Sequence, residues 1–154
     1  MIVRPIVVRA LLLSLLLVGC ARPAPPPGAS AAAGDDAPFS YDVLVTALQS
    51  AGATVETTGE VEQVFFAVKG RTARIDGADV QIFEYADAAS RMADSSLIAP
   101  DGGSIGTTMV TWVDQPTFWA QGRLTVLYVG REAAVIERLG AVLGDPLTEP
   151  WPVP

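Results

Sequence analysis

The 154-residue chain carries 10 Lys and Arg residues against 17 Asp and Glu residues, and it contains no His and a single Cys. The net negative charge argues against nucleic acid as a partner, because nucleic-acid-binding proteins need a basic face. Without His, Ser-His-Asp and Cys-His nucleophiles are excluded, as are ordinary zinc, copper and haem sites. One Cys also rules out an internal disulfide. We therefore expect no cofactor and no metal.

Residues 1–19 have the layout of a secretory signal peptide. Arg4 and Arg9 provide a basic start, and an unbroken run that is apolar apart from one Ser follows from Ala10 to Val18. The run is too short to span a bilayer core, which takes about 20 residues. A permanent transmembrane anchor is therefore the less favoured alternative.

The segment Leu17-Val18-Gly19-Cys20 resembles the lipobox of bacterial lipoproteins. The resemblance implies cleavage between Gly19 and Cys20 and attachment of a diacylglyceryl group to the Cys20 thiol. Acyl chains anchor a protein because each buried methylene contributes about 0.8 kcal/mol, and two chains hold where one does not. An extracytoplasmic, lipid-anchored protein is thus predicted, with an ordinary signal peptide and a free Cys as the alternative. The sequence leaves open whether the protein resides at an inner or an outer membrane.

Residues 20–38 form a predicted tether that is rich in Pro and Ala. They offer few large apolar side chains to bury, so we expect a flexible or extended segment that reaches about 50–60 Å at roughly 3 Å per residue. Loss of residues 1–19 removes Arg4 and Arg9 and no carboxylate, which leaves 8 cations against 17 carboxylates, a net charge of −9. Such a chain gains nothing from an anionic membrane surface, so the lipid is the expected membrane contact.

Residues 39–146 are predicted to form one α+β domain, followed by a loose Pro-rich tail at 147–154. Ser40 and Asp87 are expected to cap two helices, and Asp76-Gly77 and Gln121-Gly122 to turn two hairpins. The predicted elements are a helix from Ser40 to Gly52, strands at 64–68, 72–75 and 80–85, a second helix with Ala89, Met92, Ala93 and Leu97 on its inner face, strands at 108–113, 117–120 and 123–129, and a helix at 131–143. Short turns between strands predict a mostly antiparallel sheet with about three packed helices.

Several predicted strands are apolar on both faces. In the strand at 123–129, for example, Leu124 and Val126 point opposite to Leu127 and Val129. A sheet with one solvated face should alternate more cleanly. Either helices cover both faces, or one face meets a ligand or a partner. The second alternative predicts a groove lined by Phe83, Tyr85, Trp112 and Trp119.

Carboxylates are the remaining candidates for catalysis. Acid–base work needs two of them facing one another across a cleft, and the sequence marks no cleft, so solvated turns and helix caps are the favoured interpretation. The Gly-rich stretch at 101–106 leads into a predicted strand rather than a helix, which argues against a phosphate-binding loop. The candidate pairs are Glu60 with Glu62, Asp76 with Asp79, and Glu84 with Asp87.

Segments 61–66, 80–87, 105–113 and 122–130 resemble a group of small bacterial lipoproteins without an assigned activity. The resemblance supports export and supplies no catalytic residue. The sequence therefore predicts a non-catalytic lipoprotein of the cell envelope, attached to the membrane through Cys20, whose domain binds a partner protein, a glycan or a small ligand. The alternative is a small lipoprotein enzyme that uses paired carboxylates, such as a glycan hydrolase.

Overall fold

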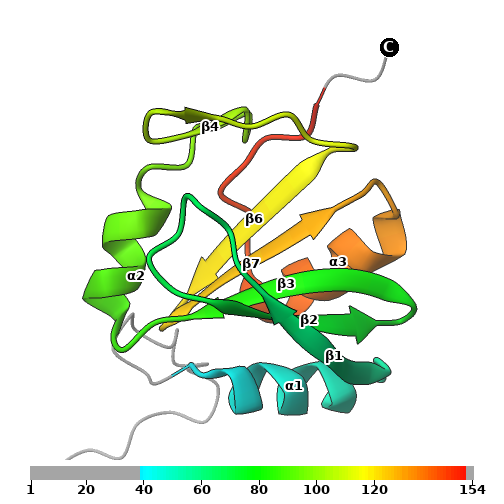
Figure 1. The fold of residues 1–154 in the computed structure, drawn as a ribbon. Coiled ribbons are helices and arrows are strands. Elements are labelled where there is room, and N and C mark those ends of the chain that lie inside the picture. The colour runs from blue at the N-terminus through cyan, green and yellow to red at the C-terminus, as the bar shows by residue number, and fades with distance from the viewer. Residues whose placement is uncertain (1–38, 152–154) are drawn as a thin grey trace, which may run out of the picture. The chain divides into compact units, whose positions relative to one another are not determined.

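The computed structural model describes residues 39–151, and it confirms the predicted α+β class (Figure 1). The predicted signal peptide, Gly19, Cys20 and the tether lie outside the described residues. The elements in chain order are α1 (Tyr41–Ser50), β1 (Val55–Val61), β2 (Gly70–Ile75), β3 (Ala78–Glu84), α2 (Ala88–Ser95), β4 (Ser104–Ile105), β5 (Thr108–Met109), β6 (Pro116–Gln121), β7 (Leu124–Val129) and α3 (Ala133–Leu143).

Five strands form one antiparallel sheet in the order β1-β2-β3-β7-β6, and β4 and β5 form a separate two-stranded sheet. The β2–β3 turn is Asp76-Gly77, as predicted, and both residues adopt positive φ values of 50° and 93°. This conformation matches the twist of a two-residue hairpin and suits Asp-Gly. The β6–β7 turn is Gly122-Arg123, one residue later than predicted, because Gln121 still pairs with Leu124.

The predicted helix ends are partly confirmed. Asp87 caps α2, since its Oδ1 accepts a hydrogen bond of 2.7 Å from the Ser90 amide. Ser40 occupies the N-cap position of α1, but its side chain makes no capping hydrogen bond. The carbonyl of Ser40 instead accepts the Leu44 amide at 3.0 Å, so the helix begins where expected without the expected side-chain cap.

The first core lies between one face of the sheet and the helices α1 and α3, which contact each other. Strand residues at alternate positions point into it, among them Val80 and Ile82 from β3 and Val126 from β7. The helix predicted at 131–143 corresponds to α3, and its residues Val135 and Leu139 are buried in this core. Apolar residues at helical spacing therefore pack against apolar residues at strand spacing.

The second core lies on the opposite face of the sheet, and loops rather than long helices cover much of it. Residues 64–68, predicted as a strand, form turns and bends, because the chain must reverse there to bring Phe66 onto Phe83. Of the strand predicted at 108–113, only Thr108–Met109 pairs with a neighbour. The chain after Met109 still places Val110 and Trp112 against the second core.

The predicted inner face of α2 is wrong. Met92 and Leu97 are 49% and 50% exposed, whereas Arg91 and Ser95 are the buried residues of the helix. The reason is a polar contact that the hydrophobic pattern does not reveal, because the Nε of Arg91 donates a 3.0 Å hydrogen bond to the Gly122 carbonyl. The helix thus packs through a buried Arg side chain that is hydrogen-bonded to a carbonyl, rather than through Met92 and Leu97.

The chain after α3 is docked as far as Trp151, contrary to the predicted loose tail. The Leu147 amide donates to the Phe118 carbonyl at 2.7 Å, and the Phe118 amide donates to the Thr148 hydroxyl at 3.1 Å. The segment therefore runs along β6, an edge strand of the sheet (Figure 1). An edge strand presents unpaired backbone groups, and the tail satisfies some of them here.

Candidate binding surfaces

The four aromatic residues of the predicted groove do not line one exposed surface. Trp119 is fully buried in the first core, whereas Phe83 and Tyr85 are buried in the second core, on the opposite face of the sheet. Trp112 is half-buried over the second core and donates a 2.7 Å hydrogen bond to the Gly102 carbonyl. These residues are packing elements of two separate cores, so the predicted groove is not formed.

An aromatic cluster fills the second core. Phe66 stacks at a tilt on Phe83 with ring centroids 4.6 Å apart, and it meets Phe118 edge-to-face at 6.3 Å. Trp112 contacts Phe65 at 6.0 Å and Phe118 at 5.8 Å, both edge-to-face. Edge-to-face pairs of this kind add about 0.5–1.5 kcal/mol to simple burial. The cluster thereby joins the loop at 62–69 to the segment at 110–115.

Three large apolar side chains project outward from the loop at 62–69 and from the chain between the end of β5 and residue 113. Val64, Met109 and Val113 are 92%, 82% and 98% exposed, and we call this set the loop patch. The segment after β5 keeps a strand-like alternation, because Val110 and Trp112 pack inward while Met109 and Val113 face outward. The strands β3 and β7, by contrast, have apolar residues covered on both faces. The loop patch therefore holds the three most exposed of the large apolar side chains within residues 39–151.

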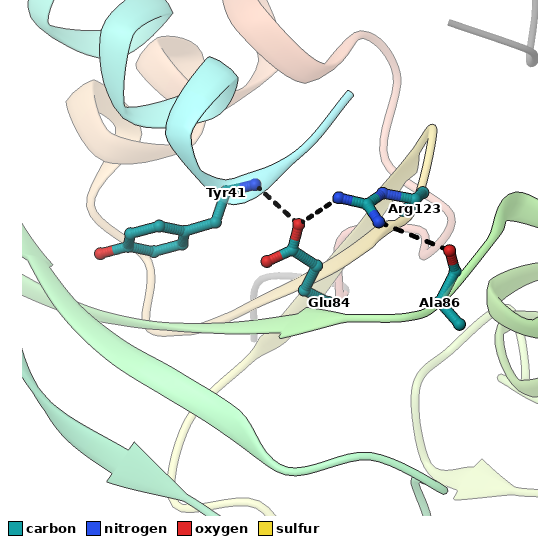
Figure 2. A network of polar contacts seen from close by, with 4 residues as sticks. All are labelled: Tyr41, Glu84, Ala86 and Arg123. Carbon is teal, nitrogen blue, oxygen red and sulfur yellow. Dashed lines mark hydrogen bonds and ion pairs between the residues drawn. The ribbon is translucent and has the colours of Figure 1, made fainter. Parts of the chain in front are cut away.

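A polar network holds the start of the described chain against the sheet (Figure 2). Glu84 accepts hydrogen bonds at its Oε1 from Arg123 at 2.8 Å and from the Tyr41 amide at 3.4 Å. Arg123 also donates to the Ala86 carbonyl at 3.4 Å. The Phe39 carbonyl accepts the Arg123 amide at 3.2 Å. The carboxylate of Glu84, one of the predicted catalytic candidates, is thus part of the network that fixes the entry of α1.

Four of the five other candidate carboxylates, all except Glu60, are also engaged in structural contacts. Glu62 pairs with Lys69, Asp76 with Arg138 and Asp79 with Arg74, each at 3.2 Å. Asp87 caps α2, and the hydrogen bond that its carboxylate accepts from the Ser90 amide holds the pKa of that carboxyl below its usual value. A catalytic acid needs the opposite shift, a raised pKa in a secluded site. These contacts match the favoured interpretation of solvated turns and caps.

A buried polar group lies beneath α2. The Tyr85 hydroxyl has no hydrogen-bond partner that meets normal geometry among the described residues. Burial raises the pKa of Tyr85 strongly, and the nearby Asp94 carboxylate raises it further. Asp94 itself accepts the Ala67 amide at 2.8 Å. Asp94 therefore links α2 to the loop at 62–69, and the raised pKa keeps the Tyr85 hydroxyl neutral.

Three further findings bear on function. No helix within residues 39–151 is long and apolar enough to cross a membrane. In the same described part of the chain, no group of three or more acidic or Cys side chains is arranged to hold a metal ion. Neither a known protein family, nor a characterised protein, nor a solved structure matches this chain.

Proposed function

We propose that the protein is a lipid-anchored, extracytoplasmic binding domain that recognises a partner protein through the loop patch and performs no catalysis. The N-terminal sequence supports the anchor, because a basic start, a short apolar run and the lipobox-like Leu17–Cys20 follow one another in the required order. The loop patch carries the binding role. Val64 and Val113 each adjoin one ring of the contact between Phe65 and Trp112, so the exposed apolar side chains lie on segments that touch, and exposed apolar surface of this kind is typical of protein interaction sites.

Charge supports a protein as the occupant of the loop patch. The mature chain would carry a net charge of −9, which repels both an anionic bilayer surface and a second copy of the same chain. A partner with an apolar segment flanked by neutral or basic groups has no such penalty. An apolar centre with a polar rim is the usual composition of such interfaces.

The position of Val113 relative to β6 agrees with this choice. The described chain starts beside the β6–β7 turn, where Phe39 contacts Gly122, whereas Val113 precedes the other end of β6. Six strand residues separate the two ends by roughly 20 Å. A tether of residues 20–38 would therefore attach at one end of β6 and leave Val113 at the other, where a partner has access.

The anchor is tested by replacing Cys20. We expect the wild-type protein in the membrane fraction, with a mass that includes the acyl chains, and the Cys20→Ser variant released from the membrane and equally folded. Membrane retention of Cys20→Ser would show that an uncleaved signal anchor holds the protein instead.

The loop patch is tested by site-specific photo-crosslinking in intact cells. A crosslinker at position 113 or 64 should yield one adduct of defined mass that Met109→Gln weakens, while a crosslinker at Val43, a 44% exposed residue of α1, should yield none. An adduct of twice the chain mass would indicate self-association and contradict the proposal. So would binding of the Cys20→Ser protein to vesicles of phosphatidylglycerol and phosphatidylethanolamine.

A further inference from the structure

A cavity of about 340 Å³ lies where the docked C-terminal segment meets the start of α3. This volume is at the small end of the range for ligand pockets, about 300–1,000 Å³. The lining is mostly apolar and includes three polar side chains, which is the usual composition of a site for a small molecule. The lining residues are Gln115, Arg131, Ala133, Ile136, Glu137, Pro150 and Trp151.

The aromatic wall of the cavity is fixed in place. The indole nitrogen of Trp151 donates a 2.7 Å hydrogen bond to the Asp101 carbonyl. Two residues earlier, the Glu149 amide donates to the Pro100 carbonyl at 2.7 Å. The ring is thus anchored at its polar edge. An apolar ring held at its edge can offer a face to a ligand at low entropic cost.

The polar side chains of the cavity provide both donors and an acceptor. Arg131 is positioned by a 2.7 Å ion pair between its Nε and Asp114, which leaves the terminal guanidinium nitrogens as donors. Gln115 is 9% exposed and offers an amide that both donates and accepts. Glu137 adds a carboxylate on α3. Residues that can donate and accept hydrogen bonds, from separate parts of the chain, therefore line the same cavity as Trp151.

We infer that this cavity is a subsite for one ring of a neutral saccharide. A pyranose has an apolar face of C–H groups that stacks on an aromatic ring, and an edge of hydroxyls that both donate and accept hydrogen bonds. The combination of Trp151 with Arg131, Gln115 and Glu137 matches these two surfaces. An anionic ligand fits less well, because Glu137 lines the cavity and Asp114 already pairs with Arg131.

The site is tested by titrating the mature Cys20→Ser chain with chitotriose and with maltotriose. NMR spectra record the indole N–H signals of its three Trp residues during each titration. The variant Trp151→Phe assigns the signal of Trp151. We expect one of the trisaccharides to shift that signal saturably, with a dissociation constant in the millimolar range or tighter, and to leave the buried Trp119 unaffected.

Variants decide whether the shift reports this cavity. Trp151→Ala should weaken binding at least tenfold, and Glu137→Ala, which leaves the aromatic wall intact, should weaken it several-fold. Glu132→Ala, at the N-cap of α3 and outside the cavity lining, should bind as the parent does. No saturable shift with either sugar, equal affinity in Glu137→Ala, or a comparable response to sodium acetate would overturn the assignment. None of these measurements depends on the lipid anchor or on the loop patch.

Discussion

Trp119 is more buried than Trp112. We nevertheless expect Trp119→Phe to lower the free energy of unfolding less than Trp112→Phe does. Trp119 is fully buried, and its indole N–H has no hydrogen-bond partner among the described residues. Phe in its place loses about three ring atoms, roughly 2 kcal/mol at about 0.8 kcal/mol per buried carbon. It also removes an unsatisfied buried donor, which returns about 1–3 kcal/mol. The two effects nearly cancel, so we expect Trp119→Phe to lie within about 1 kcal/mol of the wild type.

Trp112 is less buried, but its indole N–H donates to the Gly102 carbonyl at 2.7 Å. Trp112→Phe therefore loses both ring contacts and a hydrogen bond, and it leaves that carbonyl without this donor. We expect a cost of about 2 kcal/mol. As a reference for the full packing value, Trp119→Ala should cost about 3–5 kcal/mol, as large-to-small substitutions in a core do.

Urea unfolding followed by circular dichroism at equal m-values measures all three free energies of unfolding. If Trp119→Phe cost as much as Trp119→Ala, the indole N–H would be making a hydrogen bond that the structure lacks. If Trp112→Phe cost nothing, the bond to Gly102 would be absent in solution. Either result would refute the assignment of these two rings to their different environments.

Two more predictions concern turns and caps. Gly122→Ala should destabilise the domain by about 1–3 kcal/mol more than Gly77→Ala, because a Cβ at Gly122 would lie 2.5 Å from the Phe39 Cβ, whereas one at Gly77 has open space. Both positions have positive φ, so the backbone strain is common to the two variants. Equal unfolding midpoints for the two variants would contradict the contact between Gly122 and Phe39. The pKa of Asp87 is lowered by its bond to the Ser90 amide, so its charge stabilises the fold above the unfolded value of 3.8 and loses this effect as the pH falls through the folded pKa. The unfolding midpoint of Asp87→Asn should therefore lie below that of the wild type at pH 7 and approach it toward pH 2, and a constant difference would exclude the linkage.

Elements that combine a local turn signal with a regular apolar pattern could be predicted from the sequence. Asp76-Gly77 identified the β2–β3 hairpin, and the alternation in β7 correctly placed Val126 and Leu127 on opposite faces of the sheet. Both signals are local, since turn geometry and side-chain period depend on adjacent residues. The class and order of elements followed from them.

The elements that could not be predicted depend on distant contacts. The middle of β1 is exposed, so only its pairing with β2 defines it as a strand. Tail docking likewise depends on Thr148 meeting Phe118, 30 residues away. The predicted groove failed for a related reason, because residues between Trp112 and Trp119 leave strand geometry, and side-chain parity is not conserved across such a segment.

The two faces of the sheet differ in how they are covered, and this difference favours the second face for the proposed partner-binding loop patch. The helices α1 and α3 cover the first face, and their backbone groups are paired within each helix. Much of the second face is covered by loops that hold on through aromatic side chains such as Phe66 and Trp112. Loops of this kind tolerate changes in sequence and can adjust to a partner, whereas the scaffold beneath them stays rigid. The exposed Val64 and Val113 lie on such loops, and Met109 ends the two-residue strand β5, so a binding surface there can vary without loss of the first core.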